Sequence, residues 1–223
     1  RNLMSTSSTL NGPSLPPADG SAPEQLVLLL HGVGADGNDL IGLAPYFQQV
    51  LPKALFVSPD APFPYDMAPF GRQWFSLQER TPEAFDLGTR LAAPILNDFI
   101  DGQLAEHGLS ESQTALIGFS QGTMMSLHVG PRRDQPVAGI LGYSGALANP
   151  TKLVDDIQSY PPVMLIHGDS DEVLPVSSLP KAVGGLEAAG VPVTSHVRPG
   201  LGHGIDEEGI KLGVTFLESI FRS

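Results

Sequence analysis

Short uninterrupted runs of apolar residues recur along the chain from residue 25 onward, and segments with helical spacing lie between them. Runs of this length without polar alternation are typical of strands that are buried on both faces of a parallel sheet. The runs that predict strands are 25–30, 53–58, 114–119, 137–143, 162–167 and 193–197. Strands that alternate with helices favour an α/β fold, in which helices cover both faces of a mainly parallel sheet.

The segments between these runs predict the helices. The clearest helix spans 82–107, where large apolar residues recur at three- and four-residue intervals and Gly108 follows as a stop signal. Residues 38–51 begin with a capping residue and predict a second helix, although Pro45 argues against an unbroken one. Further helices are expected after Gln121, over 176–189 and over 206–221.

The first part of the chain has a different composition. Residues 1–24 are rich in Ser, Thr, Pro and Gly and show no apolar period, which is typical of a flexible tail. A chain of 223 residues, of which 41% are hydrophobic, can bury one substantial core. We therefore expect a flexible segment over 1–24 and a single domain over 25–223.

Charge and composition narrow the classes of partner and cofactor. Twelve Lys and Arg residues against 24 Asp and Glu residues give a formal net charge of -12, which repels nucleic acids and anionic membrane surfaces. The chain contains no cysteine, so disulfides, zinc–thiolate sites and thiol nucleophiles are excluded. No apolar stretch is long enough to cross a bilayer, and no signal peptide is recognisable. The expectation is a cytoplasmic protein without cofactor, metal or membrane insertion, with a homodimer as a possible assembly.

A serine follows the third apolar run, with glycine two positions before it and two positions after it. A Gly-x-Ser-x-Gly pattern at a strand-to-helix turn is that of the nucleophile elbow, where larger neighbours would crowd the backbone. The alternative is an ordinary hydroxyl in a glycine-rich bend. The pattern makes Ser120 the candidate nucleophile and the backbone N–H of Gln121 a candidate oxyanion donor, and the Gln121 side chain is expected to matter less than this N–H.

Loops after later strands offer the base and the acid that a serine nucleophile needs. Of the six histidines, His203 lies in a glycine-flanked loop after the last run, whereas His31 and His167 precede loops with other expected roles. The loop after 162–167 contains Asp169 and Asp171, and the residues alone leave the choice between them open. The chain order Ser, Asp, His is that of the α/β-hydrolases.

Several ordered segments carry a resemblance to a known family: LLLHGVGADG, SPDAP, RQWF, LIGFSQG, LIHGDSDEVLP and GLGH. From about residue 26 to residue 221, the chain resembles the small carboxylesterase and phospholipase branch of the α/β-hydrolases, which includes the acyl-protein thioesterases. The resemblance implies that Asp171 is the triad acid, that His203 is the base and that the N–H of Val33 is the second oxyanion donor. Many relatives have glycine where this chain has Thr123, which is a departure from the pattern.

The connection 59–82 is long and carries several large apolar side chains. These side chains either wall an apolar acyl groove or fasten the connection to the core, and the match of RQWF to the family favours the groove. The connection from Tyr143 to Val163 is too short to contain a lid domain. The candidate substrate-binding residues are Met67, Phe70, Trp74, Phe75 and Leu174.

These observations predict a metal-independent serine carboxylesterase that acts on short to medium acyl esters as small-molecule substrates. An acyl-protein thioesterase or lysophospholipase that acts on long acyl chains is the alternative within the class. A catalytically inactive hydrolase fold that serves as a binding module is the alternative outside it.

Overall fold

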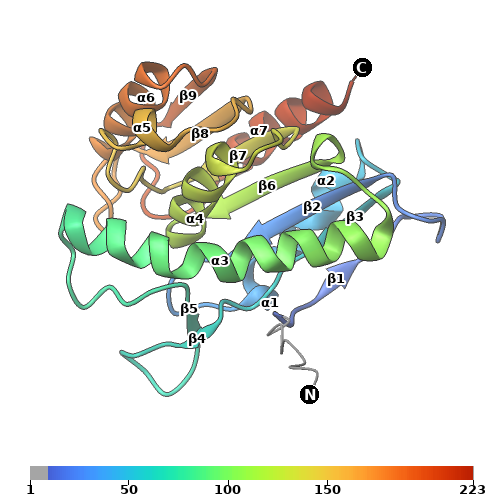
Figure 1. Cartoon of the computed structure of the whole chain (residues 1–223), viewed down its shortest axis with the longest axis horizontal. Helices are drawn as coiled ribbons and strands as arrows, with labels where there is room; N and C mark the ends of the chain where they lie inside the picture. The colour runs from blue at the N-terminus through green and yellow to red at the C-terminus, as the bar shows by residue number, and fades with distance from the viewer. Residues whose placement is uncertain (1–9, 223) are drawn as a thin grey trace, which may run out of the picture.

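A twisted sheet of seven strands runs through the computed structural model, which describes residues 10–222 (Figure 1). The strand order across the sheet is β1-β3-β2-β6-β7-β8-β9, and every neighbouring pair is parallel except β1 with β3. The strands are β1 (Ser14–Leu15), β2 (Gln25–Leu30), β3 (Ala54–Val57), β6 (Thr114–Phe119), β7 (Gly139–Tyr143), β8 (Val163–Gly168) and β9 (Val193–Arg198). The six predicted strands are confirmed, with ends that differ by no more than two residues.

The first strand corrects the prediction of a flexible tail. Ser14 and Leu15 pair antiparallel with Val57 and Phe56 of β3, and the N–H of Glu24 donates to a carbonyl oxygen just before β3. A two-residue edge strand is too short to show an apolar period, so the sequence pattern could not reveal it. The first nine residues of the predicted tail lie outside the described residues.

Helices cover both faces of the sheet, as predicted, and they bury two separate apolar layers. Leu26, Leu28 and Leu30 of β2 point to one layer, which includes α3 (Pro82–His107), α4 (Gln121–Val129) and α6 (Ser178–Ala188). Val27 and Leu29 point to the other layer, which includes α1 (Gly37–Leu40), α2 (Ala44–Gln48) and α7 (Glu207–Phe221). The alternation along one strand explains why the run 25–30 is apolar without interruption.

The predicted helix over 38–51 is wrong as a single element. The structure has α1, a 3₁₀ turn over Ile41–Leu43 and then α2, with Pro45 in the first turn of α2. A proline ring clashes with the carbonyl group four positions earlier, so the helix restarts where proline is tolerated. The side chain of Asp36 accepts a hydrogen bond from the N–H of Asn38 at 2.9 Å and caps α1.

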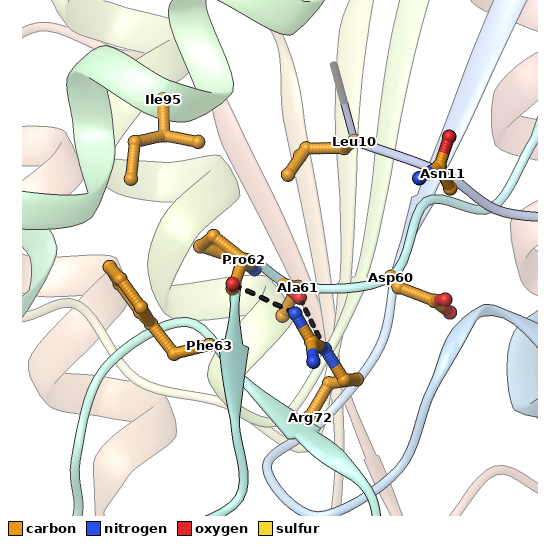
Figure 2. Close-up of a pocket in the computed structure, with 8 residues that line it drawn as sticks. All are labelled: Leu10, Asn11, Asp60, Ala61, Pro62, Phe63, Arg72 and Ile95. Atoms are coloured by element: carbon orange, nitrogen blue, oxygen red, sulfur yellow. Dashed lines mark hydrogen bonds between the residues drawn. The ribbon is translucent and has the colours of Figure 1, made fainter. Parts of the chain in front are cut away.

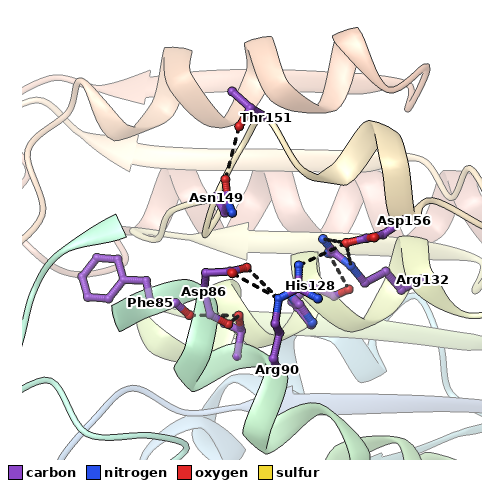
Figure 3. A network of polar contacts seen from close by, with 9 residues as sticks. Phe85, Asp86, Arg90, His128, Arg132, Asn149, Thr151 and Asp156 are labelled. Atoms are coloured by element: carbon purple, nitrogen blue, oxygen red, sulfur yellow. Dashed lines mark hydrogen bonds and ion pairs between the residues drawn. The ribbon is translucent and has the colours of Figure 1, made fainter. Parts of the chain in front are cut away.

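The predicted helix over 82–107 is confirmed as α3, with Thr81 as its N-cap and Gly108 in the left-handed region at φ 63°. An ion-pair network ties α3 to its neighbours (Figure 3). Arg90 of α3 contacts both Asp86 and Asp156, and Asp156, at the end of α5 (Leu153–Asp156), also accepts hydrogen bonds from Arg132. The network links three segments that are far apart in sequence along one face of the sheet.

Candidate active site

The carboxyl ends of the parallel strands meet at one edge of the sheet, and the candidate residues follow these ends. Ser120 comes directly after β6, Asp171 lies in the loop after β8, and His203 lies between β9 and α7. The loop after β2 carries Val33. Side chains that are far apart in sequence therefore converge because the strands are parallel.

Ser120 stands on a strained turn. Its backbone has φ 55° and ψ −116°, a conformation that residues with side chains rarely adopt. A Cβ at Gly118 would collide with the backbone of Thr123, and a Cβ at Gly122 would collide with a carbonyl oxygen of β2. The two glycines are therefore required by the close approach of α4 to the sheet, and the turn points the Ser120 hydroxyl out of the strand end.

His203 joins the serine to the acid. Its Nε2 lies 3.0 Å from Oγ of Ser120, and its Nδ1 lies 2.7 Å from Oδ2 of Asp171. A carboxylate only accepts hydrogen bonds, so Nδ1 carries the proton and Nε2 is free to accept the hydroxyl proton of Ser120. The ring of Phe119 packs against the imidazole with 5.0 Å between ring centroids, which restricts the ring on one side.

The carboxylate of Asp171 is buried and surrounded by donors. Oδ1 accepts the N–H groups of Val173 and Leu174, each at 2.9 Å, and Oδ2 accepts Nδ1–H of His203. Burial alone would raise the pKa of Asp171, but the hydrogen bonds from His203 and from the two N–H groups hold it below its ordinary value. Asp171 therefore carries a negative charge beside His203 at neutral pH.

The second acid of the same loop has a different position. Oδ1 of Asp169 accepts the N–H of Gly200 at 2.7 Å and the hydroxyl of Ser170 at 3.0 Å. The bond from Gly200 holds the loop after β8 to the turn after β9, the bond from Ser170 lies within the loop after β8, and neither involves the triad. The structure thus separates the two aspartates that the residues alone left open.

His167 contacts the loop that carries Asp171, and the sequence did not reveal this contact. Its Nε2 lies 2.9 Å from the carbonyl oxygen of Leu174 and 3.3 Å from Oδ2 of Asp171, and the side chain is buried. A carbonyl oxygen only accepts, so Nε2 carries a proton and donates it to the carbonyl oxygen of Leu174, with the carboxylate of Asp171 close by. His167 thereby holds the loop that carries Asp171 and lies beside its buried carboxylate, at a strand end that the sequence marked only as a histidine before glycine.

The other histidine at a strand end has a structural role. The N–H of Ala61 donates to Nε2 of His31 at 2.9 Å, so Nδ1 carries the proton and donates to the carbonyl oxygen of Gly32 at 2.6 Å. Burial lowers the pKa of His31, which favours the neutral ring that this arrangement needs. His31 therefore fastens the start of the Val33 loop.

A small hairpin holds the Val33 loop in place. Strands β4 (Phe63–Pro64) and β5 (Arg72–Gln73) pair antiparallel, and the backbone of Arg72 exchanges hydrogen bonds with Gly34 and Ala35 at 2.7 and 2.8 Å. The guanidinium of Arg72 donates to the carbonyl oxygens of Ala61 and Pro62 (Figure 2). Arg72 also lines a cavity of about 510 Å³ that contains none of the triad residues.

The backbone N–H of Val33 has no hydrogen bond within residues 10–222 and can serve a ligand.

The side chain of Gln121, which was expected to matter less than its N–H, makes two structural hydrogen bonds. Oε1 accepts the N–H of Trp74 at 2.8 Å, and Nε2 donates to the carbonyl oxygen of Phe75 at 2.7 Å. The side chain is fully buried and binds two backbone groups more than forty positions away in the sequence. Gln121 therefore fastens the connection between β5 and α3 to the elbow.

Two of the predicted substrate-binding residues belong to the core. Trp74 is fully buried and donates its indole N–H to the carbonyl oxygen of His31 at 3.1 Å, and Phe75 packs in the apolar layer of α3. Met67 and Phe70 are 67% and 75% exposed and do not line the cavity at Ser120. The groove prediction is therefore wrong for Trp74 and Phe75, which fasten the connection, as the alternative held. For Met67 and Phe70, which extend into solvent, substrate binding stays a prediction.

Leu174 does line the cavity that contains Ser120 and His203. This cavity has a volume of about 280 Å³, and its wall is mainly apolar. Its lining residues are Gly32, Val33, Ala35, Tyr65, Leu77, Arg80, Phe85, Phe119, Ser120, Met124, Val173, Leu174 and His203. Leu77 and Phe85, which the sequence did not single out, line the cavity, whereas the predicted Trp74 and Phe75 do not.

Thr123 replaces a glycine without opening the elbow. Its hydroxyl donates to the carbonyl oxygen of Tyr143 at 2.9 Å, and its side chain lies against Gly142 and Gly145. A Cβ at either glycine would lie too close to Thr123. The side chain at position 123 is thus accommodated by two glycines on the neighbouring strand end.

No group of three or more His, Asp and Glu side chains within residues 10–222 is arranged to hold a metal ion. No helix of that segment combines the length and apolar character needed to span a bilayer.

Comparisons with known proteins bear on the family to which the chain belongs. Residues 17–221 match the family model described as phospholipase/carboxylesterase. The chain is 30% identical over 194 residues to esterase YpfH of Escherichia coli, a match that covers 87% of this chain and 82% of that protein. It is 30% identical to acyl-protein thioesterase 1 of Saccharomyces cerevisiae, with 68% of this chain and 72% of that protein covered. The crystal structure of esterase PE8 superposes with a TM-score of 0.91 at 40% identity, covering 95% of this chain and 99% of that one.

Proposed function

The chain belongs to the phospholipase/carboxylesterase family of α/β-hydrolase-like esterases, and we propose that it hydrolyses carboxylic esters through an acyl-enzyme on Ser120. The observation that carries this proposal is the continuous chain of hydrogen bonds from Ser120 through His203 to Asp171, with distances of 3.0 and 2.7 Å. The order and the atoms involved match the needs of nucleophilic catalysis by serine.

The proposed reaction has two halves. Oγ of Ser120 attacks the carbonyl carbon of the ester while Nε2 of His203 takes the hydroxyl proton. The tetrahedral oxyanion is held by the N–H groups of Val33 and Gln121, and such donors each lower the barrier by about 3 kcal/mol. His203 returns the proton to the leaving alcohol, and a water molecule then attacks the acyl-enzyme by the same route. Asp171 keeps the imidazole in one tautomer and stabilises its cation.

The size of the cavity supports short to medium acyl groups as substrates. A volume of about 280 Å³ is at the lower end for a site that takes small molecules. The apolar side chains of Leu77, Phe85, Met124 and Leu174 offer a wall for an acyl chain. A long-chain acyl-protein thioesterase or lysophospholipase is the second candidate, and the similarity to the yeast acyl-protein thioesterase favours it.

A fluorophosphonate probe and the variant Ser120→Ala test the proposal. Oγ of Ser120 should displace fluoride from the probe, so the wild-type chain should gain the mass of one probe less hydrogen fluoride and lose its esterase activity, and Ser120→Ala should gain none. Ser120→Ala should also lower kcat by about 10⁴- to 10⁶-fold for a 4-nitrophenyl ester. Undiminished turnover by Ser120→Ala would show that Ser120 is not the nucleophile, and absence of both labelling and turnover in the folded wild type would instead support a binding module without catalysis.

A series of 4-nitrophenyl esters and matching thioesters separates the two candidate substrate classes. We expect kcat/KM to be highest for short to medium acyl chains and to fall as the chain outgrows the cavity. Activity confined to long acyl thioesters would favour the thioesterase. A homodimer and a cytoplasmic location stay predictions, which size-exclusion chromatography and cell fractionation test.

A further inference from the structure

The cavity at Ser120 contains one side chain that does not fit an apolar acyl site. Arg80 lines it together with Leu77, Phe85, Met124 and Leu174. Among the lining residues, which all belong to the described segment, Arg80 alone carries a full charge at neutral pH, and none is a carboxylate. A permanent cation in the wall of a small, mostly apolar cavity is a polar group of the kind that sets specificity.

Arg80 also differs from the other arginines in its contacts. Within residues 10–222 its guanidinium has no hydrogen bond to another side chain or carbonyl group and no carboxylate within 4.0 Å. Every other arginine of that segment has at least one such partner: Arg72, Arg90, Arg132, Arg133, Arg198 and Arg222. Arg80 is therefore not held by the fold, and all five of its N–H donors are free for a ligand.

The neighbours of Arg80 do not neutralise it. Arg80 is itself exposed, and so are its sequence neighbours Glu79 and Glu83, but of these three residues only Arg80 lines the cavity. The chain as a whole has a formal charge of -12, so its general field repels anions. The guanidinium of Arg80 offsets this repulsion only near the cavity, so the cavity is the place where an anion can bind.

We infer that the substrate is an ester that carries an anionic group, such as a carboxylate or phosphate, which Arg80 binds while Ser120 attacks the carbonyl. The inference rests on the proposed serine esterase function and narrows its substrate class. A planar guanidinium forms paired hydrogen bonds with a carboxylate or phosphate, which a neutral ester group cannot match. Arg80 makes no covalent bond and moves no proton, and it acts as a specificity-determining residue.

Two matched pairs of substrates locate the anionic group. In the first pair, mono-4-nitrophenyl adipate carries a carboxylate on its acyl chain and 4-nitrophenyl hexanoate is its neutral partner. In the second pair, 4-carboxyphenyl butyrate carries the carboxylate on its alcohol part and 4-(methoxycarbonyl)phenyl butyrate is its neutral partner. The quantity measured is the ratio of kcat/KM for the charged ester to that for its neutral partner, after subtraction of spontaneous hydrolysis.

The variants are Arg80→Gln, Arg80→Lys and, as a control, Arg222→Gln, which removes an exposed arginine at the end of α7. We expect the wild-type ratio to exceed one for one of the two pairs. Arg80→Gln should lower this ratio about 10- to 100-fold, in line with hydrogen bonds to a charged group, and Arg80→Lys should keep part of it. Arg222→Gln should keep the wild-type ratio.

The outcomes distinguish this inference from the proposed function. Equal ratios for wild type and Arg80→Gln in both pairs, with neutral esters still hydrolysed, would overturn the role of Arg80 and leave the serine esterase intact. A loss of ratio in Arg222→Gln as large as in Arg80→Gln would also overturn it, because the effect would then follow from net charge. Hydrolysis of no ester by the folded wild type would overturn both proposals.

Discussion

The strand-end loops and the connection between β3 and α3 both border the cavity, but they are built in different ways. In the loops, the side chains of Ser120, Asp171 and His203 are hydrogen-bonded to one another and mostly buried. In the connection, Trp74 is fully buried while Phe70 is 75% exposed, only a few residues away. The triad therefore rests on the sheet edge, whereas part of the cavity wall rests on a segment that is fastened only in places.

The largest effect on activity is expected from replacing Asp171, the buried acid among the strand-end loops. Asp171→Asn keeps the size of the side chain but removes the charge that fixes the tautomer of His203. We expect kcat to fall about 10⁴-fold with little change in KM. The matched control is Asp169→Asn, which removes a carboxylate from the same loop without touching the triad. A larger loss of kcat in the control than in Asp171→Asn would contradict the assignment of the acid.

The contact between the two regions is tested by Gln121→Met. Methionine has a similar length but cannot bond Trp74 and Phe75, so one N–H and one carbonyl group are left unsatisfied in the core. We expect the free energy of unfolding to fall by about 2–4 kcal/mol. We also expect kcat/KM to fall about 10-fold, because the elbow and the connection then shift relative to one another.

The control for Gln121→Met is Gln78→Leu, which replaces an exposed glutamine in the same connection. Urea unfolding should show a change of less than about 0.5 kcal/mol for this control. If Gln121→Met unfolds at the same urea concentration as Gln78→Leu, the side chain of Gln121 does not fasten the connection.

Low pH is expected to act differently on the buried helix behind the elbow and on the exposed connection, because the ionisable groups of these two regions are buried to different degrees. His128, on the helix behind the elbow, is buried, and this burial together with nearby Arg132 and Arg90 lowers its pKa to about 4. Asp66 and Glu79 of the connection are exposed. Between pH 6.5 and about 4 the unfolded chain therefore protonates this histidine while the folded chain does not, so stability falls as the pH falls through this window.

The expected loss from this histidine is at most about 3 kcal/mol at pH 4. His128→Leu removes the group, so its free energy of unfolding should change less with pH than that of the wild type. Urea unfolding at several pH values from 7 to 4 measures both slopes. Parallel curves for the two proteins would show that another group causes the acid dependence.

The strands, Ser120 and His203 could be predicted because they depend on local patterns and on the order of loops along one sheet edge, whereas the choice of Asp171 over Asp169 needed the family resemblance. The apolar run 25–30 needs only its own residues to indicate a buried strand, and the elbow needs only glycines at fixed spacing. The contacts of the Gln121 side chain and of His167 could not be predicted, because each depends on the placement of atoms from distant segments. For Trp74, the same aromatic side chain fits a groove or a core, and only the packing of the connection decides between them.

The smallest effect is expected at the exposed tip of the connection. Phe70→Ser should change the free energy of unfolding by less than about 0.5 kcal/mol and kcat/KM for short esters by less than about twofold, because the residue neither packs in the core nor lines the cavity. Trp74→Leu is the matched change at the buried end, and it should destabilise the protein by about 3 kcal/mol. A fall of more than about tenfold in kcat/KM for Phe70→Ser, with wild-type stability, would mean that the exposed tip contacts the substrate. The connection would then contribute to the cavity through the residues that extend into solvent rather than through those that it buries.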